Sequence, residues 1–184
     1  MIAEILALYE QGGAAAYFGE RVTQLQHALQ AAQCAERAHA DEELIGAALL
    51  HDIGHLLGGD FHAELGVIDH DRTCVEWLHA RGFSARFTAL VAGHVKAKRY
   101  LVAKHPEYLQ KLSPTSLRTL GLQGGAMSPR EVTEFESSPY WKDLLRLRAW
   151  DEEAKDPGAV TPGLEHYVPL LGRLCGELGI AEGW

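Results

Sequence analysis

Residues 47–55, AALLHDIGH, place two histidines and an aspartate in an otherwise apolar run of strong helix formers. Burying such groups costs free energy unless hydrogen bonds, opposite charges or a metal ion compensate for the lost water. His51 and Asp52 are adjacent, and His55 follows His51 by one helical turn. Imidazole and carboxylate together suit first-row transition metals. The segment therefore predicts a buried metal site on a core helix.

The rest of the chain indicates an all-α helical bundle, because helical periodicity is common and alternating strand patterns are scarce. Ser113, Ser128 and Ser138 each precede a proline, which is typical of a helix N-cap followed by proline at the first helical position. Glu131 adds a capping-box pattern to Ser128. The expected helices span residues 1–11, 14–39, 42–57, 70–81, 84–104, 106–112, 114–121, 129–136, 139–154 and 163–179.

Length, charge and cysteine usage narrow the class of protein. The 184 residues are enough for one domain with a substantial core. The net charge of −8 makes a nucleic-acid backbone a poor partner. We expect neither a signal peptide nor a membrane-spanning segment. Three widely spaced cysteines indicate reduced side chains in a cytoplasmic protein.

The expected helix 14–39 carries chemistry on the side away from its apolar stripe. At 100° per residue that side presents a tyrosine, a carboxylate and an imidazole, from Tyr17, Glu20 and His27. Glu20 and His27 are two helical turns apart, so both could line one pocket. The alternative is an ordinary solvated polar face.

Three further segments hold isolated residues of the same kinds. His70 opens the helix in VIDHDRTCVEWL, His94 and Lys98 share the apolar segment LVAGHVKAKRYL, and Asp151 follows the helix in LRLRAWDEEAKD. Each residue alone has an ordinary structural explanation, since a lysine is usually on the surface and an aspartate near a helix end is usually solvated.

Taken in order, these residues resemble the HD-domain superfamily, a group of all-α metalloproteins with the pattern H…HD…D. The two extra histidines resemble the binuclear subgroup, in which the equivalent of Asp52 bridges two ions. The resemblance implies a single HD domain over residues 1–184, with its metal-binding core at about 14–155. The implied metal ligands are His27, His51, Asp52, His70, His94 and Asp151.

The implied ligands divide between two sites. His27, His51 and Asp151 would complete one site, and His70 and His94 the other. His62 is an alternative to His70, and we favour His70 because the helix start HDRTCVEWL has the family pattern.

The surrounding segments narrow the resemblance. YFGERVTQLQHAL, LLHDIGH, GHVKAKRYL, SLRTLGLQGGAM, LRAWDEEAK and PGLEHY resemble the small mixed-valent di-iron oxygenases that cleave carbon–phosphorus bonds, the PhnZ-like and TmpB-like proteins. The resemblance implies an Fe2+/Fe3+ pair and O2 as co-substrate. The implied reaction, in phosphonate catabolism, converts a 1-hydroxyphosphonate into a carboxylic acid and inorganic phosphate. For 1-hydroxy-2-aminoethylphosphonate or its trimethylammonium analogue, the acid is glycine or glycine betaine. N-methylated forms and the shorter hydroxymethylphosphonate are the other candidate substrates.

The same resemblance assigns roles around the metals. Tyr17 and Glu20 match a gate over the iron that binds dioxygen, and Glu20 with Asp69 favours a cationic substrate. The implied phosphonate contacts are His55, Lys98, Ser116, Thr119 and Gln123. Ser116 and Thr119 are one turn apart and can face one pocket, although an ordinary capped helix explains SPTSLRTL equally well.

Two other functions remain open at the level of sequence. One is a binuclear HD phosphohydrolase acting on a nucleotide or phosphate ester, in which a metal-bound hydroxide attacks phosphorus. The other is a non-catalytic module that keeps the fold for stability. In the favoured case the partner is a small phosphonate rather than a nucleic acid or a membrane, and the chain is a monomer or small homo-oligomer.

Overall fold

The computed structural model describes residues 1–58, 61–62, 66–67 and 70–176, with side chains described for 1–58 and 74–176. Its α-helices are α1 (Ile2–Gly12), α2 (Gln24–Arg37), α3 (Glu42–Leu50), α4 (His70–His79), α5 (Ala85–Lys104), α6 (Pro114–Leu122), α7 (Pro129–Ser137), α8 (Trp141–Glu153) and α9 (Val168–Leu174). Short 3-10 helices are η1 (Ile53–Leu56), η2 (Pro106–Lys111) and η3 (Leu164–Tyr167). The expected all-α fold is confirmed. The described part also contains an antiparallel hairpin of two strands with two residues each, β1 (Phe61–His62) and β2 (Gly66–Val67). The sequence patterns did not predict this hairpin.

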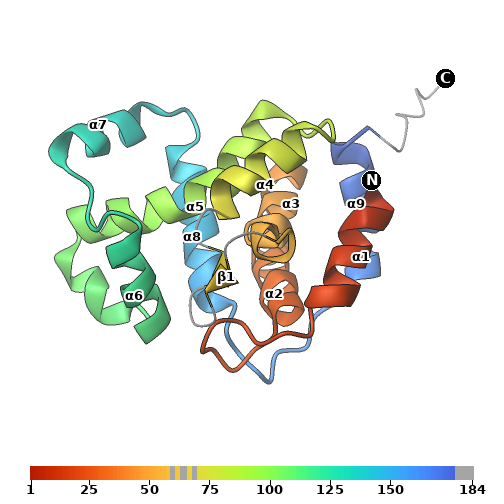
Figure 1. The fold of residues 1–184 in the computed structure, drawn as a ribbon. Coiled ribbons are helices and arrows are strands. Elements are labelled where there is room, and N and C mark those ends of the chain that lie inside the picture. Colours follow the sequence, from red (N-terminus) through yellow and green to blue (C-terminus); the bar gives the residue numbers. More distant parts are fainter. Residues whose placement is uncertain (59–60, 63–65, 68–69, 177–184) are drawn as a thin grey trace.

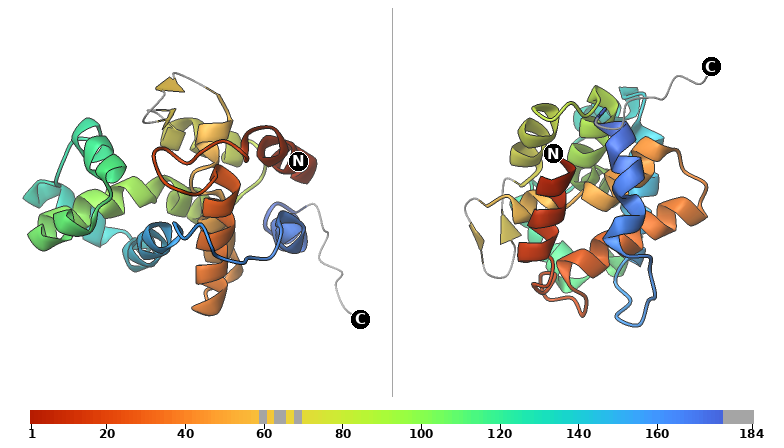
Figure 2. Two further views of the ribbon diagram at one scale, coloured as in Figure 1. Left: turned by 90° about the horizontal axis from the view of Figure 1, so that it is seen from below. Right: turned by 90° about the vertical axis from the view of Figure 1, so that its right-hand side faces the viewer.

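Helices α2, α3, α5 and α8 form the centre of the molecule (Figure 1). Helices α6 and α7 lie at one end, and α1 and α9 lie at the opposite end (Figures 1 and 2). β2 lies next to η1, and Figure 2 shows the hairpin at the margin of the molecule. One hydrophobic cluster contains buried side chains from α1, α2, α3, α4, α5, α7, α8 and α9. The single-domain organisation stays a prediction.

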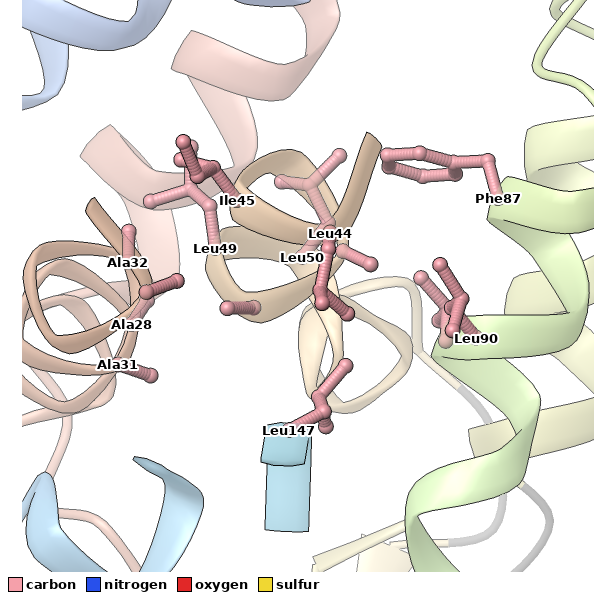
Figure 3. Packing of buried hydrophobic residues seen from close by; sticks show 14 of the residues in the cluster. Ala28, Ala31, Ala32, Leu44, Ile45, Leu49, Leu50, Phe87, Leu90 and Leu147 are labelled. Carbon is pink, nitrogen blue, oxygen red and sulfur yellow. The ribbon is translucent and has the colours of Figure 1, made fainter. Parts of the chain in front are cut away.

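The helix that leads into the histidine–aspartate pair is the most buried element of this cluster. Residues 44–50 of α3 are all buried. Figure 3 shows α3 between α2, which presents Ala28, Ala31 and Ala32, and α5, which presents Phe87 and Leu90. Small side chains let two helix backbones approach closely. The end of α3 is therefore positioned by packing on both sides.

Serine caps account for several helix starts. The expected N-caps at Ser113 and Ser128 are confirmed, since each side chain accepts a hydrogen bond from the third helical N–H. The capping box with Glu131 is also present. The expected cap at Ser138 is wrong. Ser138 instead ends α7, and α8 begins at Trp141.

The expected helix over 14–39 is wrong in its first ten residues. The backbone turns there, with Phe18 at φ 24° and Gly19 at φ 79°, which is the left-handed region that glycine favours. α2 begins only after Thr23, which forms a capping box with Gln26. That cap satisfies the orphan N–H groups of a helix start, so the local chemistry favours a boundary that the apolar stripe conceals.

The expected helix over 42–57 also breaks, at the motif itself. α3 ends at Leu50 with His51 as its C-cap, and a 3-10 turn starts at Ile53. Asp52 between them has φ −106° and ψ 9°, the bridge region in which many active-site residues lie. On a continuous helix His51 and Asp52 would diverge by about 100°. The break lets both side chains face the centre of the bundle.

The remaining helix expectations hold with small changes. Residues 106–111 form a 3-10 helix rather than an α-helix. The expected helix over 163–179 is η3 followed by α9, with a proline in the first turn of α9. Residues beyond 176 lie outside the described part of the chain. The other expected helices are present, with ends within two residues of the prediction.

Two further expectations concern the environment of the chain. Among the described residues, no helix combines the length and the apolar character needed to cross a membrane. The cysteines Cys34, Cys74 and Cys175 are all free, in agreement with the expectation of reduced side chains.

Candidate metal centre

Two imidazoles and one carboxylate from three helices meet in the centre of the bundle. His27 lies on α2, His51 caps the end of α3, and Asp151 lies on α8. All three are buried. His27 Nε2 is 3.1 Å from His51 Nε2 and 3.4 Å from Asp151 Oδ1, and His51 Nε2 is 3.8 Å from the same oxygen. Ligand atoms at about 2.1 Å from one ion are about 3–4 Å apart, so this spacing suits a single metal ion.

The outer nitrogen of each central imidazole faces a backbone carbonyl. The Nδ1–oxygen distances are 2.8 Å for His27 and Ala154, 2.9 Å for His51 and Ala48, and 2.8 Å for His94 and Val91. A carbonyl oxygen only accepts, so Nδ1 carries the proton and the Nε2 lone pair faces inward. Metal-binding histidines are usually oriented in this way. The facing Nε2 lone pairs of His27 and His51 repel each other unless a cation or a proton lies between them.

Asp52 spans the space between this cluster and His94. Its Oδ2 atom is 3.4 Å from His51 Nε2 and 3.7 Å from His27 Nε2. Its Oδ1 atom is 3.3 Å from His94 Nε2. The two carboxylate oxygens therefore face imidazole nitrogens on different sides, as a ligand that bridges two ions requires.

The electrostatics of the cluster favour a bound cation. Burial raises the pKa of Asp52, but the imidazoles of His51, His94 and His55 outweigh burial and hold that pKa well below its usual range. Burial likewise opposes ionisation of Asp151, and Arg148 with the nearby imidazoles lowers its pKa well below the usual range. Both carboxylates are therefore ionised at neutral pH. The donor set of imidazoles and ionised carboxylates fits a first-row transition metal.

Tyr17 covers the cluster from the loop before α2. Its hydroxyl donates a hydrogen bond of 2.6 Å to Asp52 Oδ2, and its ring stacks on His27 with 3.9 Å between centroids. Burial, and then the Asp52 carboxylate, raise the pKa of Tyr17. The phenol therefore stays protonated and acts as a donor to this carboxylate.

Arg148 is a buried site residue that the sequence analysis missed. It donates from Nη1 to Asp151 Oδ2 and from Nε to Glu152 Oε1 and the Tyr108 hydroxyl, at 3.0 Å each for the Nε contacts. Its Nη2 atom is buried without a hydrogen-bond partner among the described residues. The spacing of three between Arg148 and Asp151 on one helix could have indicated the pair.

A pocket with a volume of about 70 Å³ opens beside the cluster. The described residues that line it include Asp151 of the cluster, and Asp52 and His94 beside the cluster. The structure brings to the same pocket the predicted substrate and gate residues Tyr17, Glu20, His55, Lys98, Ser116, Thr119 and Gln123. Ser116 and Thr119 both line this pocket from α6.

One of the two lysines among the described pocket residues, Lys98, is itself buried. Lys98 is 4% exposed, and its ammonium group donates a 2.9 Å hydrogen bond to Thr119 Oγ1. The Oε1 atom of Gln123 is buried without a partner among the described residues. His55 lies beside Asp52, with its Nε2 atom 3.9 Å from Asp52 Oδ1.

Glu20 reaches the pocket by a route that the sequence analysis did not foresee. It lies in the turn before α2 rather than on a helix with His27. Its Oε1 atom is 2.9 Å from the ammonium of Lys155, a pocket residue that the sequence analysis missed. Lys155 ends the quoted segment LRAWDEEAK, one turn beyond Asp151, and this position was the available signal.

Three predicted residues cannot be placed by their side chains. Asp69 lies outside the described residues. His62 lies in β1 and His70 begins α4, but both side chains lie outside the described ones. The choice between these two histidines as a ligand therefore stays a prediction.

Comparison with known proteins places this geometry in a family. Residues 25–132 match the HD domain. The chain is 39% identical to the [1-hydroxy-2-(trimethylamino)ethyl]phosphonate dioxygenase (glycine-betaine-forming) of Leisingera caerulea, over 91% of the chain and 86% of that protein. It is 39% identical to the hydroxymethylphosphonate dioxygenase of Gimesia maris, over 89% of the chain and 84% of that protein. An uncharacterized protein of Acanthamoeba polyphaga mimivirus is 40% identical over 91% of the chain and 78% of its own length. This protein belongs to the HD-domain family.

Proposed function

We propose that this protein is a metal-dependent dioxygenase that cleaves the carbon–phosphorus bond of a small 1-hydroxyphosphonate. The observation that carries the proposal is the position of the histidine–aspartate cluster, which borders the same pocket as the buried Lys98. The protein is an oxidoreductase, which the names of two relatives as phosphonate dioxygenases support. The products are a carboxylic acid and inorganic phosphate.

The overall reaction balances with dioxygen as the only co-substrate. Hydroxymethylphosphonic acid and one O2 yield one formic acid and one phosphoric acid. The C–P bond breaks, carbon is oxidised, and both oxygen atoms of O2 are retained in the products. Hydrolysis of a phosphate ester, in contrast, consumes water and leaves the oxidation state of carbon unchanged.

The metal we propose is a pair of iron ions in the Fe2+/Fe3+ state. His27, His51 and Asp151 would hold one ion, His94 and His70 the other, and Asp52 would bridge them. When bound, this pair supplies the redox chemistry that activates dioxygen. The backbone carbonyls behind His27, His51 and His94 keep these three Nε2 atoms turned inward, so these ligands are oriented before a metal ion arrives.

The other side of the pocket binds the phosphonate group. Lys98 supplies a cation and Thr119 a hydroxyl, already held 2.9 Å apart. Ser116, Gln123 and His55 complete the polar lining. Charged donors in a site shielded from water bind a dianion strongly. Binding of the phosphonate here positions C1 and its hydroxyl toward the cluster.

Tyr17 and Glu20 act at the entrance to the cluster. The Tyr17 hydroxyl donates to Asp52 and orients the carboxylate that we propose as the bridge. The ring of Tyr17 lies against His27, which excludes water from that face of the imidazole. Thr115 Oγ1 donates a 2.6 Å hydrogen bond to Phe18 O, which ties this turn to α6.

Phosphate release from 1-hydroxyphosphonates, measured with and without oxygen, tests the proposal. The panel contains hydroxymethylphosphonate, 1-hydroxy-2-aminoethylphosphonate and its trimethylammonium analogue. We expect iron-loaded protein to release phosphate only when oxygen is present. Equal release without oxygen, or turnover of phosphate esters with Mn2+ alone, would establish a phosphohydrolase instead.

The wider setting follows from this activity. We propose a single HD domain over residues 1–184, acting in the cytoplasm in phosphonate catabolism as a monomer or small homo-oligomer. Its partner is the small phosphonate, and neither a nucleic acid nor a membrane takes part.

A further inference from the structure

An ion pair between Glu20 and Lys155 forms part of the pocket wall. Glu20 Oε1 and Lys155 Nζ are 2.9 Å apart, and each side chain is 18% exposed. Lys155 Nζ also lies 3.5 Å from Ser113 Oγ. Burial opposes ionisation of Glu20, but the hydrogen bonds from Ser113 and Lys155 lower its pKa overall. The pair is therefore a charged carboxylate held against an ammonium group.

The backbone on both sides of Lys155 is fixed to α2. Ala154 O faces the Nδ1 of His27 at 2.8 Å. Asp156 exchanges two hydrogen bonds with the side chain of Gln30, of 2.9 and 3.0 Å. Lys155 is therefore presented to the pocket by a rigid segment, unlike a typical surface lysine that moves freely.

This pair decides which charge the pocket accepts next to the phosphonate. Among the described residues that line it, the carboxylates are Glu20, Asp52 and Asp151. Asp52 and Asp151 face the imidazoles of the metal cluster. Glu20 is therefore the described carboxylate that a cationic substrate group could use, and Lys155 already compensates its charge.

We propose that Lys155 is a specificity-determining residue that selects 1-hydroxyphosphonates without a positive charge on the group at C1. By pairing with Glu20, it neutralises the carboxylate that, among the described residues of the pocket, an ammonium or trimethylammonium group could use. Hydroxymethylphosphonate is the smallest substrate of this class. This inference rests on the proposed function, and it replaces the expectation of a cationic substrate that the sequence suggested.

The test compares Lys155→Met with the wild-type protein on two substrates. One is uncharged at C1, hydroxymethylphosphonate, and the other is cationic, 1-hydroxy-2-aminoethylphosphonate. Both kcat/KM and the Kd under anaerobic conditions are measured, the latter by calorimetry. Wild-type protein prefers the uncharged substrate. In Lys155→Met the unpaired Glu20 attracts the ammonium and repels the phosphonate dianion, so the preference shifts toward the cationic substrate by about tenfold or more.

Two further variants separate this role from a loss of structure. Lys155→Arg keeps the charge pair and retains the wild-type preference. Adding Glu20→Gln to Lys155→Met removes the unpaired carboxylate and cancels the shift, as in a double-mutant cycle. Lys104→Met is the matched control, since Lys104 pairs with Glu136 at 3.1 Å and does not line this pocket.

The outcomes distinguish this inference from the proposed function. An active Lys155→Met enzyme with unchanged preference in both kcat/KM and Kd overturns the role of Lys155. A wild-type preference for the cationic substrate overturns it as well. If no 1-hydroxyphosphonate is turned over by the wild-type protein, the proposed function fails, and the anaerobic Kd ratio still reports the charge preference of the pocket.

Discussion

Replacing Lys98 by methionine removes one charge and leaves the side chain almost the same length. Lys98 is 4% exposed, and its ammonium donates to Thr119 Oγ1 at 2.9 Å. The phosphonate loses one hydrogen bond to a charged group, which contributes about 1.5–3 kcal/mol. We therefore expect the Kd of hydroxymethylphosphonate to rise by about ten- to a hundredfold. Methionine keeps the apolar stem packed, so little cavity is left.

The assay measures two quantities on the same protein. Anaerobic calorimetry gives the Kd of hydroxymethylphosphonate, and inductively coupled plasma mass spectrometry gives the number of iron ions bound per chain. Lys98 is not among the proposed ligands, so we expect the iron content to stay near that of the wild-type protein. Lys96→Met is the matched control, because Lys96 is an exposed lysine on the same helix.

Two results would refute the reasoning. If Lys98→Met binds hydroxymethylphosphonate as tightly as the wild-type protein, the lysine does not contact the phosphonate. If the variant loses its iron while Lys96→Met keeps it, Lys98 supports the metal centre and its role is misassigned.

Two other changes test the metal centre and the helix that leads into it. His94→Ala should lower the iron content by about one ion per chain, while the cluster of His27, His51 and Asp151 keeps one iron ion. An unchanged iron content would show that His94 is not a ligand. Asp41 is the N-cap of α3, and Asp41→Ala removes its 3.0 Å hydrogen bond from Leu44 N. The free energy of unfolding, measured in urea, should fall by about 1–2 kcal/mol, and a change near zero would contradict this. Asp41→Asn should lower the free energy of unfolding by less. Arg86 lowers the pKa of Asp41, so the cost of Asp41→Asn is fully present above about pH 4 and disappears as pH falls through the lowered pKa.

The parts of the fold that sequence predicted are those fixed by local chemistry. Ser113 and Ser128 each combine a capping hydroxyl with a following proline, and both start helices as expected. The same pattern failed at Ser138, whose backbone N–H ends α7 on Phe135 O and whose hydroxyl accepts a 3.3 Å hydrogen bond from Tyr140 N. The hydroxyl therefore bonds the chain just before α8 and not the first turn of that helix.

The residue types of the candidate site were predictable from the sequence, whereas the course of the backbone through the site was not. The histidine–aspartate pair stood out because its burial requires compensation. The turn that carries Tyr17 and Glu20 was hidden, because an apolar stripe continues through a capping box at Thr23. Hydrophobic periodicity predicts which face of a helix is buried. A cap sets the residue at which the helix begins or ends, whichever face is buried.

The partners of the site were the hardest part to predict. Arg148 and Lys155 are ordinary surface residue types on a polar segment. Arg148 contacts Asp151 on the same helix, and this contact follows from helical spacing. Lys155 contacts Glu20, which lies 135 residues earlier in the chain. This second contact depends on how the segment after α8 packs against the turn before α2.

Oxygen uptake and phosphate release, recorded together on the iron-loaded protein with hydroxymethylphosphonate, test the central claim most directly. The account predicts that one O2 is consumed for each phosphate released and that release stops when oxygen is removed. Phosphate release without oxygen uptake would contradict it.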